Sequence, residues 1–186
     1  THALDLRSRI LQQFEKLTLS DRQAIAEPVL SFVVVGAGPT GVEICGALAE
    51  LRRHILPKDY PDLDTGRMKI TLVEGLERVL PAMSEKSGRR ARSYLEEMGV
   101  EVILESLTES YDGETVRLSN GKELKSHTLI WAAGVKANRA DDLPTGRKSG
   151  KLQVDRNNRV FRDPESGALL EGVFAIGDVA LMKTDE

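Results

Sequence analysis

Residues 30–43 read LSFVVVGAGPTGVE, which sets an apolar run, a glycine-rich turn and the start of a helix in immediate succession. The run at 30–35 is continuous and rich in β-branched residues, a pattern typical of a strand buried on both faces of a parallel sheet. A strong helix is predicted to follow over residues 40–56. A strand, a tight turn and a helix in this order predict the first half of a βαβ unit.

The three glycines of this turn have the Gly-x-Gly-x-x-Gly spacing of dinucleotide-binding loops. Gly36 allows the tight turn, Gly38 lets the backbone approach a pyrophosphate, and Gly41 lets the helix lie against the strand. The helix N-terminus offers unpaired N–H groups and the positive end of its dipole to the phosphates. The alternative is a turn that serves packing alone, but the strand before it and the helix after it favour a binding loop.

The same alternation of strand and helix continues along the chain. Residues 68–74 are predicted to form a second apolar strand and 100–104 a third, with a helix at 84–98 between them. Gly99 directly follows this helix, as glycine commonly does at a helix end. Strands that alternate with helices predict a doubly wound parallel sheet. The predicted fold class is therefore α/β, a Rossmann-like FAD/NAD(P)-binding domain.

A different pattern begins after the third strand, at residues 105–131. Two dipeptides that favour tight hairpin turns, Asp112-Gly113 and Asn120-Gly121, lie between short alternating segments. They predict a small antiparallel β-meander, after which residues 128–132 return to the main sheet as a strand.

The two ends of the chain are predicted to lie outside this core. Residues 3–17 carry one apolar helical stripe, and a shorter helix is expected at 20–26. After a loop at 135–150, a short ribbon and a last buried strand are expected at 152–154, 159–161 and 173–176. The predicted domains are a helical connector at 1–28, a dinucleotide-binding domain at 29–150 and a further segment at 151–186.

The composition narrows the functional class. The 186 residues carry a net charge of −3 and 4% aromatic residues, which argues against the basic, aromatic surfaces of nucleic-acid-binding proteins. No apolar run approaches the ~18 residues of a membrane-spanning helix, and no apolar segment marks a signal peptide. The absence of an initiator Met suggests a fragment of a longer protein.

Several titratable residues are predicted to serve structure alone. The single cysteine, Cys45, excludes an intrachain disulfide, a Cys-x-x-Cys pair and a cysteine-rich zinc site, and its place on the inward helix face favours a core residue over a nucleophile. The three histidines lack metal-ligand spacing, so no metal is expected. Arg89, Arg90 and Arg92 are predicted to form a solvated helix face.

Glu74 ends the second predicted strand. In this fold an acidic residue there accepts hydrogen bonds from the adenosine ribose hydroxyls and repels a 2′-phosphate. We therefore expect a preference for NADH over NADPH, although Arg78 lies one helical turn further on and could tolerate a phosphate. The alternative is a solvated loop carboxylate.

Glu43 lies in the first turn of the glycine-loop helix, two residues after the third glycine. Its carboxylate is expected near the nicotinamide end of a bound dinucleotide, where it could hold the carboxamide. The alternative is a carboxylate that only balances the helix dipole.

Small residues end two other predicted strands. Ala133 and Gly134 follow the returning strand, where a ligand can lie against the backbone at the carboxyl end of the sheet. Gly177 and Asp178 follow the last predicted strand, and an aspartate at such a place can hydrogen-bond the ribityl or phosphate region of a flavin. Each signal is modest alone, and ordinary tight packing is the alternative for the first.

In this order the motifs resemble those of the two-dinucleotide-binding-domain flavoproteins. Within that superfamily they are similar to type II NADH dehydrogenase, the single-subunit NADH:quinone oxidoreductase that pumps no protons. The similar segments are residues 36–43 (GAGPTGVE), 131–135 (WAAGV) and 173–178 (VFAIGD). Pro-Thr-Gly-Val-Glu is the most discriminating piece, because disulfide-reductase relatives differ there and need a cysteine pair that this sequence lacks.

The resemblance implies a reaction. NADH would bind on the glycine loop beside the flavin of an FAD domain, a hydride would pass from nicotinamide C4 to flavin N5, and two electrons would then pass to a membrane quinone. The implied pyrophosphate-binding residues are Gly36, Gly38, Pro39, Thr40 and Gly41. The other implied site residues are Glu74 at the ribose, Glu43 as the catalytic residue near the nicotinamide, Ala133 and Gly134 along the cleft, and Gly177 and Asp178 toward FAD.

The resemblance implies that residues 29–150 are the NADH-binding domain and that residues 151–186 begin the returning segment of the FAD domain. It also implies parts that this sequence does not contain. An FAD-binding glycine motif is expected before Thr1, and a membrane-docking segment after Glu186. We therefore expect the chain alone to bind NADH but neither to retain FAD nor to reduce quinone. The longer protein of which this chain is expected to be a fragment is termed the parent. The expected partners are NADH, the FAD-binding segment of the parent, the quinone and, in a homodimer, a second copy of the chain. The parent is expected in the cytoplasm, held at the membrane by its other parts.

Two other interpretations stay open. One is the NAD(P)H-binding domain of another flavoprotein reductase, of the ferredoxin or sulfide:quinone type. The residues after Gly41 and the charge after Glu74 argue mildly against it. The other is a stand-alone dinucleotide-binding module, which would bind NADH with nothing to reduce. A full-length reading frame would separate the module from the domain of a longer enzyme.

The assignment of Glu74 to the ribose generates a test of cofactor choice. The substitution Glu74→Arg is expected to weaken NADH binding and to favour NADPH, because a guanidinium attracts the 2′-phosphate that a carboxylate repels. Titration of the variant with both nucleotides measures the change. An unchanged preference would remove Glu74 from the site.

Overall fold

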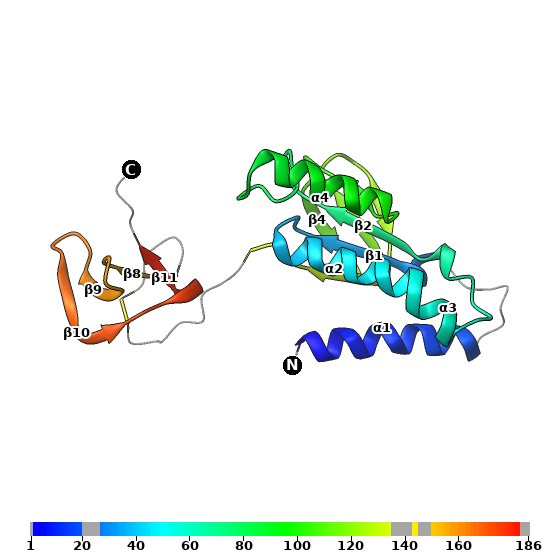
Figure 1. The fold of residues 1–186 in the computed structure, drawn as a ribbon, viewed down its shortest axis with the longest axis horizontal. Helices are drawn as coiled ribbons and strands as arrows, with labels where there is room; N and C mark the ends of the chain where they lie inside the picture. The colour runs from blue at the N-terminus through cyan, green and yellow to red at the C-terminus, as the bar shows by residue number, and fades with distance from the viewer. Residues whose placement is uncertain (1, 20–26, 135–142, 145–149, 183–186) are drawn as a thin grey trace. The chain divides into compact units, whose positions relative to one another are not determined.

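A computed structural model of the chain describes residues 2–19, 27–134, 143–144 and 150–182. The chain forms two compact units, Thr1–Ala133 and Gly134–Glu186 (Figure 1). The first unit has the predicted α/β architecture, and the second has a small sheet of its own. The predicted boundaries at residues 28 and 150 remain predictions.

The first unit is built on a parallel sheet of four strands in the order β3-β2-β1-β7. Its strands are β1 (Ser31–Val35), β2 (Lys69–Val73), β3 (Glu101–Ile103) and β7 (Thr128–Trp131). In the register, β1 places Ser31 opposite Lys69 of β2 and Phe32 opposite Thr128 of β7. The Rossmann-like fold class and the return of residues 128–132 to the main sheet are confirmed.

Helices alternate with these strands. They are α1 (His2–Leu19), α2 (Pro39–Glu50), α3 (Leu56–Asp59) and α4 (Glu85–Glu97), with 3₁₀ turns η1 (Glu27–Leu30) and η3 (Thr65–Arg67). The helix predicted over residues 40–56 passes instead into a π-helical turn, η2 (Leu51–Ile55), before α3. The predicted helix at 84–98 is confirmed as α4: the Ser84 hydroxyl accepts the N–H of Ser87, and Gly99 follows with φ +76°.

The predicted antiparallel meander is confirmed. Its strands are β4 (Thr108–Tyr111), β5 (Thr115–Leu118) and β6 (Glu123–Lys125). In its two turns Gly113 and Gly121 have φ of +101° and +83°, the left-handed conformation that glycine adopts without a Cβ penalty. The N–H groups of Glu114 and Thr115 donate to Asp112 and lower the pKa of that carboxyl to about 2.

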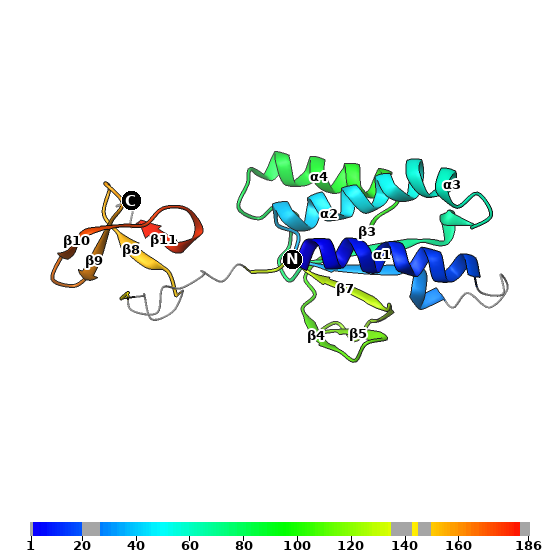
Figure 2. The ribbon, with the colours of Figure 1, turned by 90° about the horizontal axis from the view of Figure 1, so that it is seen from below.

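Both faces of β1 are buried, which explains its unbroken apolar run. Phe32 and Val34 lie in the cluster formed with the helices, where the ring of Phe14 stacks on that of Phe32 at a centroid distance of 6.3 Å. Val33 and Val35 lie in a second cluster formed with the meander. Figure 2 shows α2 and α4 on one side of the sheet and the meander on the other.

The predicted N-terminal helix is confirmed as α1. Ile10 and Phe14 of its apolar stripe are buried, and Leu6 packs against the same cluster. The helix predicted at 20–26 lies outside the described residues, as does most of the loop predicted at 135–150.

The second unit holds a sheet of four strands in the order β10-β9-β8-β11. Its elements are β8 (Leu152–Val154), β9 (Arg159–Asp163), β10 (Ala168–Phe174), the 3₁₀ turn η4 (Gly177–Val179) and β11 (Ala180–Met182). The antiparallel pairing of β8 with β9 confirms the predicted ribbon. Leu152, Val154, Val160 and Ala175 form a small core of their own.

The expectation of a buried strand at residues 173–176 is wrong. β10 ends at Phe174, and the side chains of Phe174 and Ile176 are 63% and 73% exposed, whereas Ala175 between them is buried. An unbroken apolar run predicts cover on both faces. Within this unit only alternate side chains of the run reach the core, so Phe174 and Ile176 face outward.

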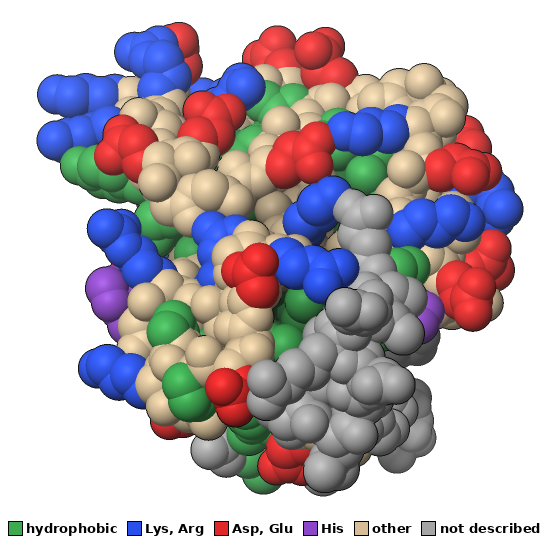
Figure 3. Space-filling view, turned by 90° about the vertical axis from the view of Figure 1, so that its right-hand side faces the viewer, with side chains coloured by type: hydrophobic (Ala, Val, Ile, Leu, Met, Phe, Trp, Pro, Cys, Tyr) green, Lys and Arg blue, Asp and Glu red, His purple; other side chains and the backbone are tan. Residues whose placement is uncertain are grey.

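Acidic and basic side chains are interspersed over the face of the molecule drawn in Figure 3. Several charged groups of the first unit form ion pairs, such as Lys122 with Glu101 at 2.6 Å and Arg117 with Asp112 at 3.1 Å. Because these pairs are exposed, each contributes little to stability.

Arg52, in the π-helical turn, links three elements. Its guanidinium donates to the carbonyl oxygen of Met68 at 2.9 Å and to those of Met98 and Gly99 at the end of α4. A cation at a helix C-terminus satisfies carbonyls that have no partner within the helix and interacts favourably with the helix dipole. The wider turn thus carries a side chain that ties α4 to the start of β2.

Replacing Arg52 is expected to destabilise the fold. Arg52→Ala removes charge-assisted hydrogen bonds to three carbonyls and should lower the free energy of unfolding by about 1–2 kcal/mol. Arg53→Ala, at an exposed position of the same turn, is the matched control and should change it by less than about 0.5 kcal/mol. Urea denaturation measures both, and equal effects would contradict the linking role of Arg52.

Candidate functional site

The glycine loop directly follows β1 at the carboxyl edge of the parallel sheet. Gly36 has φ +101°, and a Cβ on it would lie 2.7 Å from the Cα of Ala133. A Cβ on Gly41 would lie 1.8 Å from the carbonyl oxygen of Gly36. Both positions therefore need glycine for packing. Gly38 differs, because a Cβ there would meet no atom within 4 Å.

The N-terminus of α2 opens at this loop without a side-chain cap. Gly38 is the N-cap residue and makes no side-chain cap hydrogen bond, and Pro39 occupies the first turn, where its missing N–H costs nothing. Thr40 follows and is exposed. The first-turn N–H groups of a helix have no partner within it, so this uncapped start beside open space suits an anion.

Glu74 lies against the glycine loop although it is 37 residues away from Ala37 in the sequence. The N–H of Ala37 donates to Oε2 of Glu74 at 2.6 Å, and the N–H of Leu76 donates to its Oε1 at 3.0 Å. The carbonyl of Ala37 accepts the N–H of Leu80 at 2.8 Å. The carboxylate thus stands at the strand end where it was predicted, and it also fixes the loop.

Two exposed leucines flank Glu74 and were missed by sequence reasoning. Leu76 is 54% exposed and Leu107 is 64% exposed. The side chain of Leu107 lies over Gly75, where a Cβ would come within 2.6 Å of it. The loops that carry them are joined, because Ser106 donates its N–H to the carbonyl of Glu74 at 3.0 Å. The sequence did contain a signal for them, because each of the two loops that follow a strand end carries an apolar residue.

Ala133 is brought to the glycine loop by β7. The N–H of Ala132 donates to the carbonyl of Val35 at 2.8 Å, which continues the pairing of β7 with β1. The indole N–H of Trp131 donates to the carbonyl of Ala133 at 2.7 Å and holds this turn. Ala133 thus packs beside Gly36, as a residue lining the same edge must.

The predicted site residues divide between the two units. The first unit brings together the glycine loop, Glu74 and Ala133, and it carries Glu43 on an exposed side of α2. Gly134 begins the second unit with φ +71°. Gly177 and Asp178 lie in η4 of the second unit and are both exposed. The roles of all these residues in binding stay predictions.

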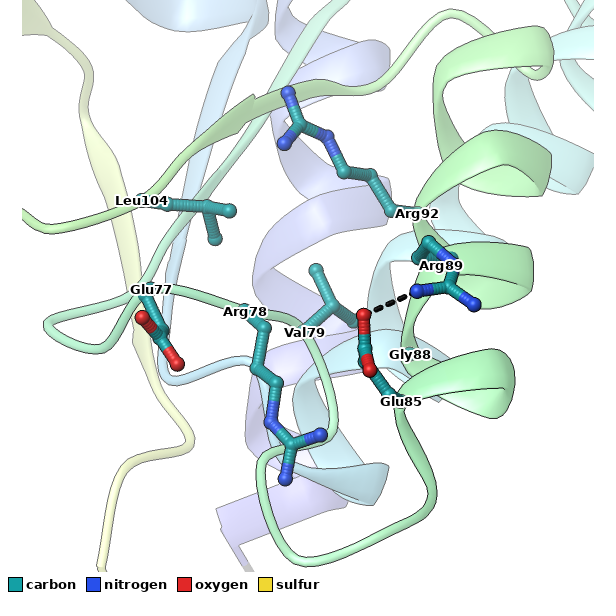
Figure 4. A pocket seen from close by; sticks show the side chains of 8 residues that line it. All are labelled: Glu77, Arg78, Val79, Glu85, Gly88, Arg89, Arg92 and Leu104. Atoms are coloured by element: carbon teal, nitrogen blue, oxygen red, sulfur yellow. Dashed lines mark hydrogen bonds and ion pairs between the residues drawn. The ribbon is translucent and has the colours of Figure 1, made fainter.

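A cavity of about 420 Å³ lies between α4 and the β2–α4 connection, residues 74–84 (Figure 4). It is lined by Glu77, Arg78, Val79, Glu85, Gly88, Arg89, Arg92 and Leu104. Arg89 pairs with Glu85, and Arg92 pairs with Glu96 at 2.7 Å. Acidic partners therefore offset the guanidinium charges of Arg89 and Arg92, whereas the third lining guanidinium, that of Arg78, donates to the carbonyl of Pro81. The solvated helix face predicted at Arg89, Arg90 and Arg92 is confirmed by their exposure.

A family model described as "Pyridine nucleotide-disulphide oxidoreductase" matches residues 4–185, nearly the whole chain. The chain belongs to the pyridine nucleotide-disulphide oxidoreductase family. This membership agrees with the strand, glycine loop and helix at the candidate site, which are the parts of the fold that such a domain needs to hold a pyridine nucleotide.

Relatives within this family confirm the resemblance to type II NADH dehydrogenases. The type II NADH:quinone oxidoreductase Ndh of Mycobacterium tuberculosis is 37% identical over 187 residues, which cover 97% of this chain and 40% of the relative. The type II NADH:quinone oxidoreductase of Haemophilus influenzae is 30% identical over 87% of this chain and 35% of its own length. The chain therefore spans 35–40% of the length of these relatives.

Solved structures of similar proteins share the fold. NDH2 from Plasmodium falciparum in complex with NADH matches with a TM-score of 0.77 and 25% identity, over 97% of this chain and 38% of that one. A NAD-dependent persulfide reductase from A. fulgidus matches with a TM-score of 0.61 and 26% identity, over 91% of this chain and 27% of that one.

Within the described residues, no helix combines the length and apolar character needed to cross a bilayer.

The disulphide in the family's description cannot form within this sequence, whose only cysteine is Cys45. Cys45 is buried on α2, and burial raises the pKa of its thiol to about 12. The thiolate is the nucleophilic form, so this thiol is inert and the expected core role is confirmed. Among the described residues, no group of His, Cys, Asp and Glu could hold a metal ion.

The raised pKa of Cys45 predicts protection from alkylation. Iodoacetamide at pH 8 should label Cys45 at least about a hundredfold more slowly in the folded chain than in the same chain in urea. Unfolding gives the reagent access to the thiol and restores its ordinary pKa. Mass spectrometry measures the labelled fraction over time. Equally fast labelling in both states would place Cys45 outside the core.

Proposed function

We propose that this chain is the NADH-binding portion of a flavoprotein that transfers a hydride from NADH to FAD and then electrons to a membrane quinone. One observation carries the NADH-binding part: open space faces Gly38 at the uncapped start of α2, with the Glu74 carboxylate beside the same loop. The redox part is supported by relatives named type II NADH:quinone oxidoreductase.

In this proposal the pyrophosphate lies at the start of α2. The N–H groups of Gly38, Thr40 and Gly41 are the donors, and the helix dipole adds a positive partial charge. Gly36 and Pro39 shape the loop without contributing a donor. The residues fit a dinucleotide because the space at Gly38 is what an approaching phosphate requires.

The adenosine end lies at Glu74. The carboxylate already accepts two backbone N–H groups, yet each oxygen has a further lone pair for a ribose hydroxyl. The exposed side chains of Leu76 and Leu107 flank the adenine and cover its faces with apolar surface. The charge of Glu74 opposes a 2′-phosphate, which favours NADH over NADPH.

The nicotinamide end lies toward Glu43 and the turn at Ala133 and Gly134. The Glu43 carboxylate accepts the carboxamide N–H groups and so orients the ring that gives up the hydride. The small side chain of Ala133 and the absence of one at Gly134 allow the dinucleotide to lie against the backbone.

The second unit contributes residues to FAD binding in the longer parent protein. Gly177 and Asp178 are exposed and offer a carboxylate and an accessible backbone to the flavin, and the exposed Phe174 and Ile176 offer apolar surface to the FAD-binding segment of the parent. Bound FAD supplies the hydride acceptor and the route for two electrons to the quinone. We further propose that the parent acts as a peripheral membrane protein of the respiratory chain and forms a homodimer.

A second candidate is the nucleotide-binding domain of another reductase of this superfamily. The match to a NAD-dependent persulfide reductase at 26% identity favours it. The quinone oxidoreductase from Mycobacterium tuberculosis is more similar, at 37% identity over 97% of this chain. The lone Cys45 also argues against a thiol-dependent reaction within this segment.

Titration calorimetry with NADH tests the proposal on the chain and two variants. The unchanged chain should bind NADH, and Gly38→Val should bind it at least about tenfold more weakly, because its side chain enters the space left for the pyrophosphate. Gly46→Ala is the matched control, since its Cβ would make only an ordinary contact with Met98 at 3.9 Å. It should bind NADH like the unchanged chain.

Two outcomes of this titration would count against the proposal. A folded chain that takes up FAD but no NADH would mean that the glycine loop serves the other cofactor. A Gly38→Val variant with unweakened NADH binding would show that the pyrophosphate does not approach the loop at residue 38.

A further inference from the structure

Leu80 adopts a backbone conformation that is rare for its residue type. Its φ is +53°, in the left-handed region where a Cβ approaches the following carbonyl oxygen. Its side chain is 92% removed from solvent, with 8% exposed. Such strain persists only where the surroundings hold it, and it clusters at sites that bind ligands.

The left-handed turn directs both backbone groups of Leu80 to partners. Its N–H donates to the carbonyl of Ala37 at 2.8 Å, and its own carbonyl accepts the N–H of Met83 at 2.9 Å. Ala37 is fully buried, and its N–H donates to Glu74. Both polar groups of the Ala37 residue in the glycine loop are therefore held by the β2–α4 connection.

The neighbours of Leu80 hold this conformation in place. The side chain of Val79 is 1% exposed, and its carbonyl oxygen lies so close to α4 that a Cβ on Gly88 would come within 2.5 Å of it. The guanidinium of Arg78 donates to the carbonyl of Pro81 and closes the turn. Figure 4 shows Arg78 and Val79 on the connection and Gly88 on the facing turn of α4.

The loop after β3, the next along the sheet edge, also contains a residue with positive φ whose N–H donates to a neighbouring loop. Glu105 also has φ +53°, and its N–H donates to the carbonyl of Leu76 at 3.1 Å. Two residues without glycine's freedom are thus held left-handed at the carboxyl edge of the sheet, each joining one loop of the candidate site to the next.

We propose that Leu80 is a positioning residue for the dinucleotide, acting through its backbone rather than by contact. Its left-handed conformation aims the N–H at Ala37 and keeps the glycine loop in the shape that leaves the Gly38 and first-turn N–H groups available. This inference rests on the proposed NADH-binding function. A residue that prefers negative φ would turn that N–H away and let the loop relax.

The test compares substitutions that separate backbone conformation from side-chain packing. Leu80→Val stays apolar but is β-branched and strongly disfavours positive φ. Leu80→Gly and Leu80→Asn lose the apolar side chain but adopt positive φ readily. All three are made in the chain as it stands, with circular dichroism and urea denaturation as measures of folding.

Calorimetry with NADH should order the variants by conformation. Leu80→Val is expected to weaken NADH binding by about tenfold, whereas Leu80→Gly and Leu80→Asn should stay within about threefold of the unchanged chain. The opposite order, with Leu80→Val least affected, would assign Leu80 to packing alone and overturn the proposal. If Leu80→Val does not fold, Leu80→Ala replaces it and should bind NADH more weakly than Leu80→Gly.

Amide hydrogen exchange separates this proposal from the proposed function. In the unchanged chain the amides of residues 37 and 80 should be protected, and both should exchange at least about tenfold faster in Leu80→Val but not in Leu80→Asn. If the unchanged chain binds no NADH, the proposed function fails and the exchange rates alone decide whether Leu80 holds the loop. Unchanged protection in Leu80→Val would overturn the positioning role.

Discussion

The contact between α2 and the end of β1 is closer than any side chain allows. A Cβ on Gly41 would lie 1.8 Å from the carbonyl oxygen of Gly36, so the helix reaches the strand only because residue 41 has none. This approach brings the N-terminus of α2 to the carboxyl edge of the sheet. If a side chain at residue 41 held the helix further from the strand, the N-terminus of α2 would lie away from the carboxyl edge of the sheet. The other residues of the candidate site would then no longer lie beside it.

A buried loop must satisfy its own backbone groups, and here the fold decides which ones remain free. Ala37 is fully buried, so its N–H and carbonyl need partners inside the protein. Glu74 and Leu80 supply both. The next residue, Gly38, faces open space and begins an uncapped helix. The change from a buried residue with both backbone groups paired to one that faces open space therefore falls between two adjacent residues, and under the proposed function the pyrophosphate is held there.

Local sequence was sufficient for the parts of the fold that depend on local rules. The apolar run of β1, the end of α4 before Gly99 and the two Gly-containing turns of the meander each follow from residue type and spacing, and each is confirmed. The parallel sheet follows from their order. The position of Glu74 at a strand end was predictable for the same reason.

Features that depend on distant contacts could not be predicted in this way. The hydrogen bond from Ala37 to Glu74 joins residues 37 positions apart, and Leu80, with its positive φ, donates its N–H to the carbonyl of Ala37, which is also distant from it in the sequence. The residue types at 51–55 do not distinguish the π-helical turn from an α-helix, although Arg52 within it reaches the end of α4. The prediction of a buried strand at 173–176 was wrong because burial depends on what covers each face of a sheet. A run of apolar residue types does not specify that cover.

The distribution of backbone strain supports the same division of roles. Among the described residues, the left-handed positions without glycine are Leu80, Glu105 and Asn158. Asparagine adopts this conformation readily, so Asn158 needs no special explanation. The other two follow the ends of β2 and β3, at the edge that carries the glycine loop. A sheet buried on both faces supplies the stability that offsets this strain, and the strain is concentrated where the geometry of a bound ligand would have to be held most closely.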